Sequence, residues 1–218
     1  FNGCSALSQV NISDISAWCG IEFEHENSNP LYYAEKMYLN GNLLTELVIP
    51  DDVTAIKNYA FYYCKSLTSV EIPNSVKSIG DYAFSYSTSL TNIKIGNNVT
   101  SIGDYAFYNC TALENINIPN SVKSIGANAF YNCAKIENIE IAGVESIGNH
   151  AFWSCTALKS IEIPDGVTSI EESVFSYCKG LTAIKLPGTL KSIGRDAFNQ
   201  CLVLGNIEIP NNVTSIGS

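Results

Sequence analysis

The sequence predicts a repeat solenoid, a coil of short parallel strands joined by tight turns. Phenylalanine recurs every 22–23 residues from Phe61 to Phe198, and isoleucine and cysteine columns keep the same period. A period this short is typical of solenoids, in which each unit contacts only its neighbours. About eight buried apolar side chains stabilise a unit by roughly 1.5–3 kcal/mol each. Ordering its residues costs on the order of 35 kcal/mol, so the units must stack.

Composition excludes several other classes of protein. The 218 residues carry 21 Asp and Glu against 12 Lys and Arg, a net charge of −9. We therefore expect no nucleic-acid partner, because phosphate contacts need clustered cationic side chains. The apolar content of 46% argues against intrinsic disorder. We also expect no membrane insertion, because no apolar run approaches about 18 residues.

Each repeat begins with a strand and a turn. The unit reads L-x-x-V/I-x-I-P-x-x-V-x-x-I-G-x-x-A-F-x-x-C. Val70 and Ile72 alternate with Glu71, as one face of a strand requires, and equivalent strands should lie parallel about 4.8 Å apart. Proline follows the strand in most copies and marks its exit, since it cannot donate to a ladder. The segment 76–79 and its equivalents form the return, with a second short strand.

The Ala-Phe-x-x-Cys piece predicts one helical or 3₁₀ turn that packs inward. Six cysteines share one column, which Ser87 fills in the second repeat. We expect these thiols to be free and buried, as small apolar residues. A bridge between Cys4 and Cys19, which lie outside the column, is the alternative left open. The column consists of Cys64, Cys110, Cys133, Cys155, Cys178 and Cys201.

The predicted organisation is one continuous solenoid with an interruption. Residues 1–12 match the end of a preceding repeat, and 44–218 contain seven complete repeats and a partial eighth. The fifth repeat is one residue short, at Ala142-Gly143-Val144. Neither end carries an obvious polar cap, so we expect a fragment of a longer array.

Residues 13–43 form an irregular island between these parts. Ser13-Asp14 should cap a short helix over 15–19, and 21–26 alternate like a half-exposed strand. Residues 27–30 read as a turn, and Asn40-Gly41 predicts a hairpin. The island is interpreted either as a binding element or as a wider structural coil.

The repeat unit resembles the BspA-like class of leucine-rich repeats, and the likeness covers about 80% of the chain. The resemblance implies a right-handed leucine-rich-repeat coil. It also implies an extracellular or cell-surface location and adhesion to host proteins or other microbes. The ligand of such a scaffold is chosen by its surface positions.

Aromatic side chains around the Ala-Phe turns are the candidate ligand-binding site. The core already has its phenylalanines, so several of these rings should be partly exposed, where they bring large contact area at low entropic cost. The alternative is that the rings stack along the solenoid and shield the seams between coils. The site is predicted at Tyr82, Tyr86, Tyr105, Tyr108, Tyr131 and Trp153, with a possible extension to Tyr32, Tyr33 and Tyr38 of the island.

No catalytic, cofactor or metal site is expected. The sequence offers no nucleophile, base and orienting group that belong together. His25 stands among Glu22, Glu24 and Glu26, which suit either a weak Ca²⁺ site or, as favoured here, a solvated acidic face. The predicted function is a non-enzymatic binding or adhesion module for an extracellular protein or glycan. The alternative is a structural spacer in a larger surface protein.

Overall fold

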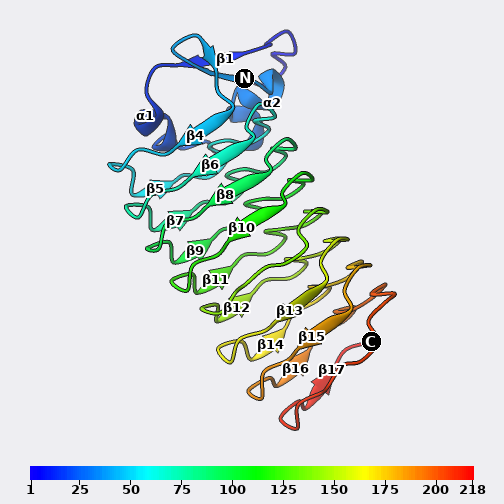
Figure 1. Ribbon diagram of the computed structural model, residues 1–218. Coiled ribbons are helices and arrows are strands. Elements are labelled where there is room, and N and C mark those ends of the chain that lie inside the picture. Colours follow the sequence, from blue (N-terminus) through cyan, green and yellow to red (C-terminus); the bar gives the residue numbers. More distant parts are fainter.

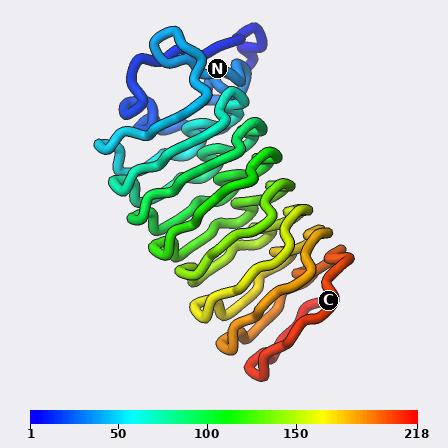
Figure 2. Tube along the Cα trace, viewed as in Figure 1, coloured from blue at the N-terminus to red at the C-terminus, as the bar shows by residue number.

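The computed structural model describes residues 1–218 as a solenoid of about nine turns. Figures 1 and 2 show the coils stacked along one axis, with residues 1–43 at one end. A typical coil runs through a front strand, a proline turn, a short return strand and a turn that holds the recurring phenylalanine. Parallel pairing of equivalent strands, one full repeat apart, joins the coils.

The front strands form two parallel sheets. One sheet has the order β10-β8-β6-β4 and the other pairs β13 with β15. Within each strand the outer residues face solvent and the central one points inward, as in β8, where Ile93 is 1% exposed. The front strands are β4 (Glu46–Val48), β6 (Ser69–Glu71), β8 (Asn92–Lys94), β10 (Asn115–Asn117), β13 (Ser160–Glu162) and β15 (Ala183–Lys185).

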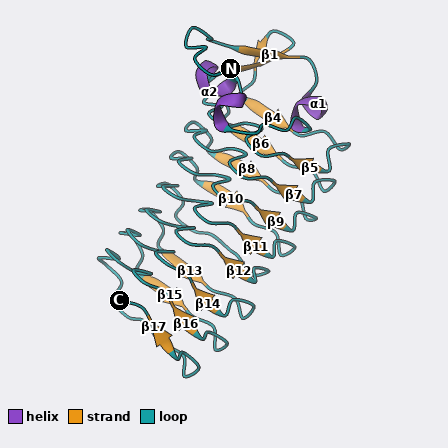
Figure 3. Ribbon diagram, turned by 180° about the vertical axis from the view of Figure 1, so that it is seen from behind, coloured by secondary structure: helices purple, strands orange, loops and turns teal.

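The return strands lie behind them, as Figure 3 shows from the opposite side. They form two further sheets, in the orders β12-β11-β9-β7-β5 and β14-β16-β17. Each strand except the last, β17, places one isoleucine in the core, and Ile216 of β17 is exposed. The return strands are β5 (Ala55–Ile56), β7 (Ser78–Ile79), β9 (Ser101–Ile102), β11 (Ser124–Ile125), β12 (Ser146–Ile147), β14 (Ser169–Ile170), β16 (Ser192–Ile193) and β17 (Ser215–Ile216).

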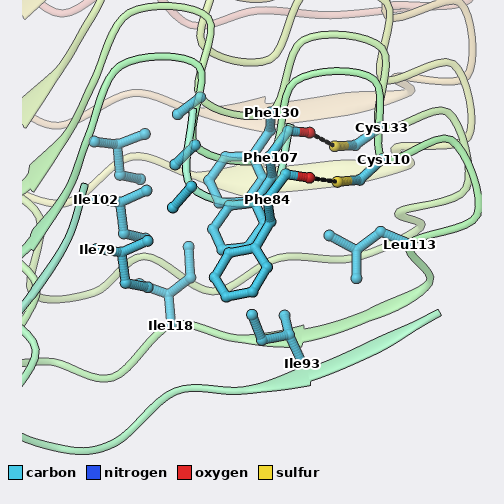
Figure 4. Close-up of a cluster of buried hydrophobic side chains, with 14 of the residues drawn as sticks. Ile79, Phe84, Ile93, Ile102, Phe107, Cys110, Leu113, Ile118, Phe130 and Cys133 are labelled. Carbon is cyan, nitrogen blue, oxygen red and sulfur yellow. Dashed lines mark hydrogen bonds between the residues drawn. The ribbon is translucent and has the colours of Figure 1, made fainter. Parts of the chain in front are cut away.

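The core is a continuous column of stacked phenylalanines between these two layers. Phe84, Phe107 and Phe130 have no exposed surface, and their ring centroids lie 5.5 and 5.3 Å apart. Figure 4 shows isoleucines of the front and return strands packed around the rings. Neighbouring coils therefore share one apolar interior, as the repeat period predicts.

The segment around each phenylalanine is a succession of turns instead of a continuous 3₁₀ helix. Bonds of the 3₁₀ type are present, for example from Tyr62 N to Tyr59 O and from Cys64 N to Phe61 O. Tyr59 and Tyr63, however, have φ values near +61°, in the left-handed region, which a 3₁₀ helix does not contain. Their N–H groups, with that of Phe61, donate to carbonyls of the next coil. The turns thus form a third ladder between coils.

The cysteine column is buried and reduced, as predicted. Cys110 and Cys133 donate their S–H groups to the carbonyls of Phe84 and Phe107, each at 3.1 Å (Figure 4). Ser87 makes the same bond to Phe61 O at 3.2 Å, which explains why serine replaces cysteine there. The column therefore supplies a hydrogen-bond donor as well as apolar volume. Cys64, Cys110, Cys133, Cys155 and Cys178 are buried, whereas Cys201 is half-buried.

Cys4 and Cys19 are both free thiols, so the bridge left open between them does not form. Cys4 is exposed, and Cys19 is fully buried at the end of α1. Burial raises the pKa of the Cys19 thiol to about 12, and nearby Asp52 and Asp14 add to the shift. The buried Cys19 therefore offers no reactive thiolate at neutral pH.

Residues 1–43 contain most of the irregular structure. Asp14 accepts a hydrogen bond from Ala17 N and caps α1 (Ile15–Cys19), as predicted. Asn40 and Gly41 both have positive φ and form the predicted hairpin turn. The other elements are β1 (Val10–Ile12), a 3₁₀ helix (Glu26–Ser28), α2 (Leu31–Ala34), β2 (Met37–Leu39) and β3 (Asn42–Leu43). Strand β1 pairs parallel with β2, and β2 pairs antiparallel with β3.

The strand predicted at 21–26 is wrong. These residues form no strand, and the 3₁₀ helix begins at Glu26. Phe23 is 9% exposed and its ring lies 5.5 Å from that of Trp18, while Ile21 faces solvent. Of the apolar residues in this alternation, only Phe23 is buried. No neighbouring strand is available for pairing.

The island covers the first coil of the repeat array and satisfies its open backbone groups. Trp18 Nε1 donates to Ala60 O at 2.7 Å, and Asn29 Nδ2 donates to Tyr59 O at 2.7 Å. Lys57 N donates to Cys19 O at 3.3 Å. In later coils the preceding repeat supplies such partners. Asn29 is fully buried, which fits a structural role for this part of the island.

Candidate binding surface

A ladder of stacked aromatic rings runs along the phenylalanine-turn edge of the solenoid. Ring centroids are 4.7 Å apart between Tyr108 and Tyr131, and 4.3 Å apart between Tyr131 and Trp153. A parallel row stacks Tyr82 on Tyr105 at 4.5 Å, and Tyr105 lies 5.5 Å from Tyr108. All six predicted site residues therefore belong to one connected set. We call this set, with the neighbours Tyr59, Tyr63 and Tyr177, the aromatic ladder.

Local backbone geometry places these rings. Residues two before and two after each phenylalanine have φ values near +60°, among them Tyr82, Tyr86 and Tyr105. Asparagine is the non-glycine residue that tolerates this conformation best, and it occupies the equivalent positions 128 and 132. Bulky residues there carry a strain of about 1–2 kcal/mol each. Tyr82, Tyr86 and Tyr105 are thus present against local backbone preference, whereas Tyr108, Tyr131 and Trp153 directly follow the phenylalanines and have no positive φ.

The rings are half-buried, and their faces contact each other. Tyr82 and Tyr105 differ in ring plane by only 4°, and Tyr131 and Trp153 differ by 8°. The exposed parts are therefore mainly ring edges and hydroxyl groups. The hydroxyls of Tyr82, Tyr105 and Tyr131 have no side-chain or backbone partner within hydrogen-bond distance, and none is sealed from solvent, whereas the Tyr108 hydroxyl is close to that of Tyr86. The ladder presents a row of free phenol groups.

The partial burial also changes the acidity of these groups. Desolvation raises the pKa of Tyr82 and of Tyr108 to about 12, and neighbouring tyrosines contribute further to both shifts. Burial also raises the pKa of Tyr131. The hydroxyls stay protonated at neutral pH and can donate a hydrogen bond as well as accept one.

Uncharged asparagines lie beside Tyr108 and Tyr131, Asp104 lies near Tyr82, and lysines cover both ends. Asn132 Nδ2 donates to Asn109 Oδ1 at 2.7 Å, next to the rings of Tyr108 and Tyr131. Lys65 lies over the ring of Tyr63 at 5.2 Å from its centroid. At the other end Lys179 lies 5.9 Å from the centroid of the Tyr177 ring. The part of the ladder around Tyr108 and Tyr131 can therefore offer hydrogen bonds and apolar contact.

Island tyrosines join the ladder only in part. Tyr32 lies 5.5 Å from Tyr63, and Tyr33 lies 4.9 Å from Tyr32. Tyr38 makes no aromatic contact, so the ladder does not extend to it. Tyr62 is 3% exposed, and its hydroxyl donates to Glu26 at 2.9 Å, so this ring belongs to the junction between island and array.

The acidic residues around His25 are occupied or dispersed. Glu22 pairs with Lys57 at 2.8 Å, which lowers the pKa of the Glu22 carboxyl, and Glu26 accepts the Tyr62 hydroxyl. No three His, Cys, Asp or Glu side chains gather as metal ligands in the structure. His150 occupies a turn position with φ of 59°, equivalent to Asn128. The acidic residues and the two histidines therefore make separate local contacts and do not form a metal site.

Exposed charges on the front strands pair between coils. Lys94 contacts Glu71 at 2.6 Å, and Lys185 contacts Glu162 at 2.5 Å. Exposed pairs of this kind stabilise weakly, but they neutralise the sheet surface. No helix of the structure has the length and apolar character needed to cross a bilayer.

Fold and repeat together define a leucine-rich-repeat solenoid. The model of the BspA type Leucine rich repeat region, with 6 copies, matches residues 34–159 and 145–218. The chain belongs to this family, whose repeats generally act in binding or as scaffolds and lack enzymatic activity. No curated protein matches the chain by sequence.

Solved structures agree with this assignment. A leucine-rich repeat protein of T. pallidum is 31% identical, with a TM-score of 0.70 over 74% of this chain and 78% of that one. A leucine-rich repeat protein of Bacteroides ovatus is 34% identical, with a TM-score of 0.73 over 79% of this chain. The match covers 48% of the Bacteroides ovatus protein, so this chain spans about half of its length.

Proposed function

We propose that the chain is a non-enzymatic binding or adhesion module, secreted or displayed at a cell surface, which binds an extracellular protein or glycan through the aromatic ladder. The family assignment supports a binding or scaffold role. The extracellular setting follows from the resemblance of the repeats to BspA-like proteins. The proposed contact residues are Tyr82, Tyr86, Tyr105, Tyr108, Tyr131 and Trp153.

One observation carries this proposal: the solenoid stacks equally well where the ladder is missing. The seventh repeat has Asp196, Asn199 and Gln200 in place of aromatic rings. Phe175 and Phe198 nevertheless stack at 5.7 Å, close to the spacing elsewhere in the column. Ring stacking at the edge is therefore not needed to hold coils together, and the strained tyrosines call for another explanation.

The alternative function is a structural spacer. The mutual stacking of ring faces favours it, because stacked rings also shield the seams between coils. The two functions differ in what the exposed hydroxyls and edges do. A spacer should accept other polar residues at these positions, whereas a binding module should lose affinity.

The array itself supplies replacements for a test. Asn128 occupies the column of Tyr105, and Ser176 occupies the column of Tyr108. The double variant Tyr105→Asn/Tyr108→Ser should therefore fold while removing two central rings. Tyr38→Asn, which removes a tyrosine outside the ladder, is the matched control.

Wild type and both variants would be applied to immobilised extracellular-matrix proteins and to a panel of oligosaccharides. Each ring at the centre of an interface should contribute roughly 1–3 kcal/mol, so the double variant should bind at least tenfold more weakly. Tyr38→Asn should bind like wild type. Equal binding by the folded double variant would exclude the ladder as the contact surface, and absence of any ligand in both panels would favour the spacer.

A further inference from the structure

The fifth repeat, residues 136–157, opens a cleft on the opposite, proline-turn edge of the solenoid. Other repeats turn through Pro-x-x-Val, whereas this one turns through Ala142-Gly143-Val144, one residue shorter and without the proline. The shortened turn cannot keep register with the turns on both sides. It stays against the fourth repeat, because a Cβ at Gly143 would lie 2.0 Å from Asn120 O.

Hydrogen bonding shows the consequence. Strands β11 and β12 remain paired, so the fifth repeat stays attached to the fourth on the return side. Toward the sixth repeat the backbone ladder is interrupted on both sides of the turn, and β12 does not pair with β14. On the front, Lys159 N donates to Glu137 O at 3.0 Å and an isolated bridge joins Asn138 to Ser160, but no further front pairing follows. In Figure 1 this coil carries no front strand between β10 and β13.

The interruption leaves backbone groups free in an extended segment. Asn138 and Glu140 are exposed while Ile139 and Ile141 are buried, which is the alternation of a front strand. The N–H groups of these residues make no regular backbone hydrogen bond, and because they alternate in direction only those of Ile139 and Ile141 face the sixth repeat. Free donors and acceptors of an extended segment are the groups that an added peptide strand can satisfy.

Between the fifth and sixth repeats these groups line an open cleft of about 840 Å³, a size typical of ligand sites. Its rim is acidic. Lys123 pairs with Glu145 at 2.9 Å and Lys185 with Glu162 at 2.5 Å, so both lysines of the rim are neutralised. The carboxylates of Glu140 and Asp165 have no partner. The rim therefore has an unbalanced negative charge.

We propose that this cleft binds an extended, cationic peptide segment of a partner protein. The free N–H groups of Ile139 and Ile141 bind the peptide main chain, and Glu140 and Asp165 bind its lysine or arginine side chains. Such a mode combines strand addition, which gives affinity, with charge complementarity, which selects the partner. The site is separate from the aromatic ladder and does not depend on the function proposed for it.

The sharpest test repairs the turn. Replacing Ala142-Gly143 by Pro-Asn-Ser, the turn of the fourth repeat at 119–121, restores the full repeat length and keeps every carboxylate. A second variant, Glu140→Gln/Asp165→Asn, keeps the cleft and removes its free charges. The control Glu46→Gln/Asp51→Asn removes two exposed, unpaired carboxylates elsewhere and changes the net charge equally.

Binding would be measured by calorimetry with an eight-residue peptide of alternating lysine and valine, its glutamate–valine counterpart and cellohexaose. We expect saturable one-to-one binding of the lysine peptide alone, at least tenfold weaker in the repaired and Glu140→Gln/Asp165→Asn variants and unchanged in the control. Unchanged binding by the repaired variant, equal loss in the control, binding of cellohexaose alone, or no saturable binding would each overturn the proposal. If the repaired variant does not fold, as circular dichroism would reveal, the charge variant and its control decide.

Discussion

Truncation of one core ring and of its surface neighbour separates the interior of the solenoid from its edge. Phe107 has no exposed surface and stacks between Phe84 and Phe130 at 5.5 and 5.3 Å. Phe107→Ala should lower the free energy of unfolding by about 3–5 kcal/mol, through lost transfer energy and the cavity left behind. The upper part of that range is expected, because two aromatic pairs are lost and the neighbouring coils hold the cavity open.

Tyr108→Ala should cost much less, about 1–2 kcal/mol. Tyr108 is half-buried, and its best-aligned contact is one ring, Tyr131 at 4.7 Å. Urea denaturation followed by far-ultraviolet circular dichroism would give both values, with wild type measured under the same conditions. Equal losses in the two variants would refute the assignment of Phe107 to the core and of Tyr108 to the edge.

Three further outcomes are expected. Cys133→Ser should be nearly neutral in urea denaturation, since serine can donate to Phe107 O as Ser87 does to Phe61 O, whereas Cys133→Ala should cost about 1 kcal/mol; a larger loss for serine would contradict the donor role. Asn29→Ala should destabilise the island by roughly 1–3 kcal/mol, detectable as faster hydrogen exchange at residues 59–60, and unchanged exchange would argue against capping. Because burial raises the pKa of the Tyr82 hydroxyl to about 12, folding stability should be fully present below pH 10 and fall as the pH rises toward 12; phenolate absorbance showing only unperturbed tyrosines would contradict this.

The period and the core were predictable because each repeat meets the same neighbours. A position that is apolar in every copy, such as the column of Phe107, must lie inside. Cysteines that recur in one such column point into the same core, one coil apart, and were therefore expected to be free thiols. The hydrogen bond from Cys133 to Phe107 O was not predictable, although the exchange of cysteine for Ser87 was a signal for a donor. Serine and cysteine share that property more than they share hydrophobicity.

The aromatic ladder was predicted as a set of residues, and stacking of its rings along the solenoid was the alternative to their exposure. Its geometry depends on positive φ at Tyr82 and Tyr105, and tyrosine gives no hint of that conformation. Asn128 and Asn132 in the same columns were the available signal, since asparagine favours it. The structure of the island was harder to predict from the sequence. Residues 21–26 alternate like a strand, but Phe23 anchors them against Trp18 and no neighbouring strand pairs with them.

The shortened fifth repeat shows how one deletion affects the two edges of a solenoid differently. The missing residue was visible in the sequence, but the opened cleft follows from register between coils, which a single repeat does not specify. On the phenylalanine-turn edge the stack is unbroken, with Phe130 and Phe152 at 5.5 Å and Tyr131 and Trp153 at 4.3 Å. The irregularity is therefore absorbed at the proline-turn edge. Repairing that turn should close the cleft and leave ligand binding by the aromatic ladder unchanged, because sites without shared contacts contribute independently.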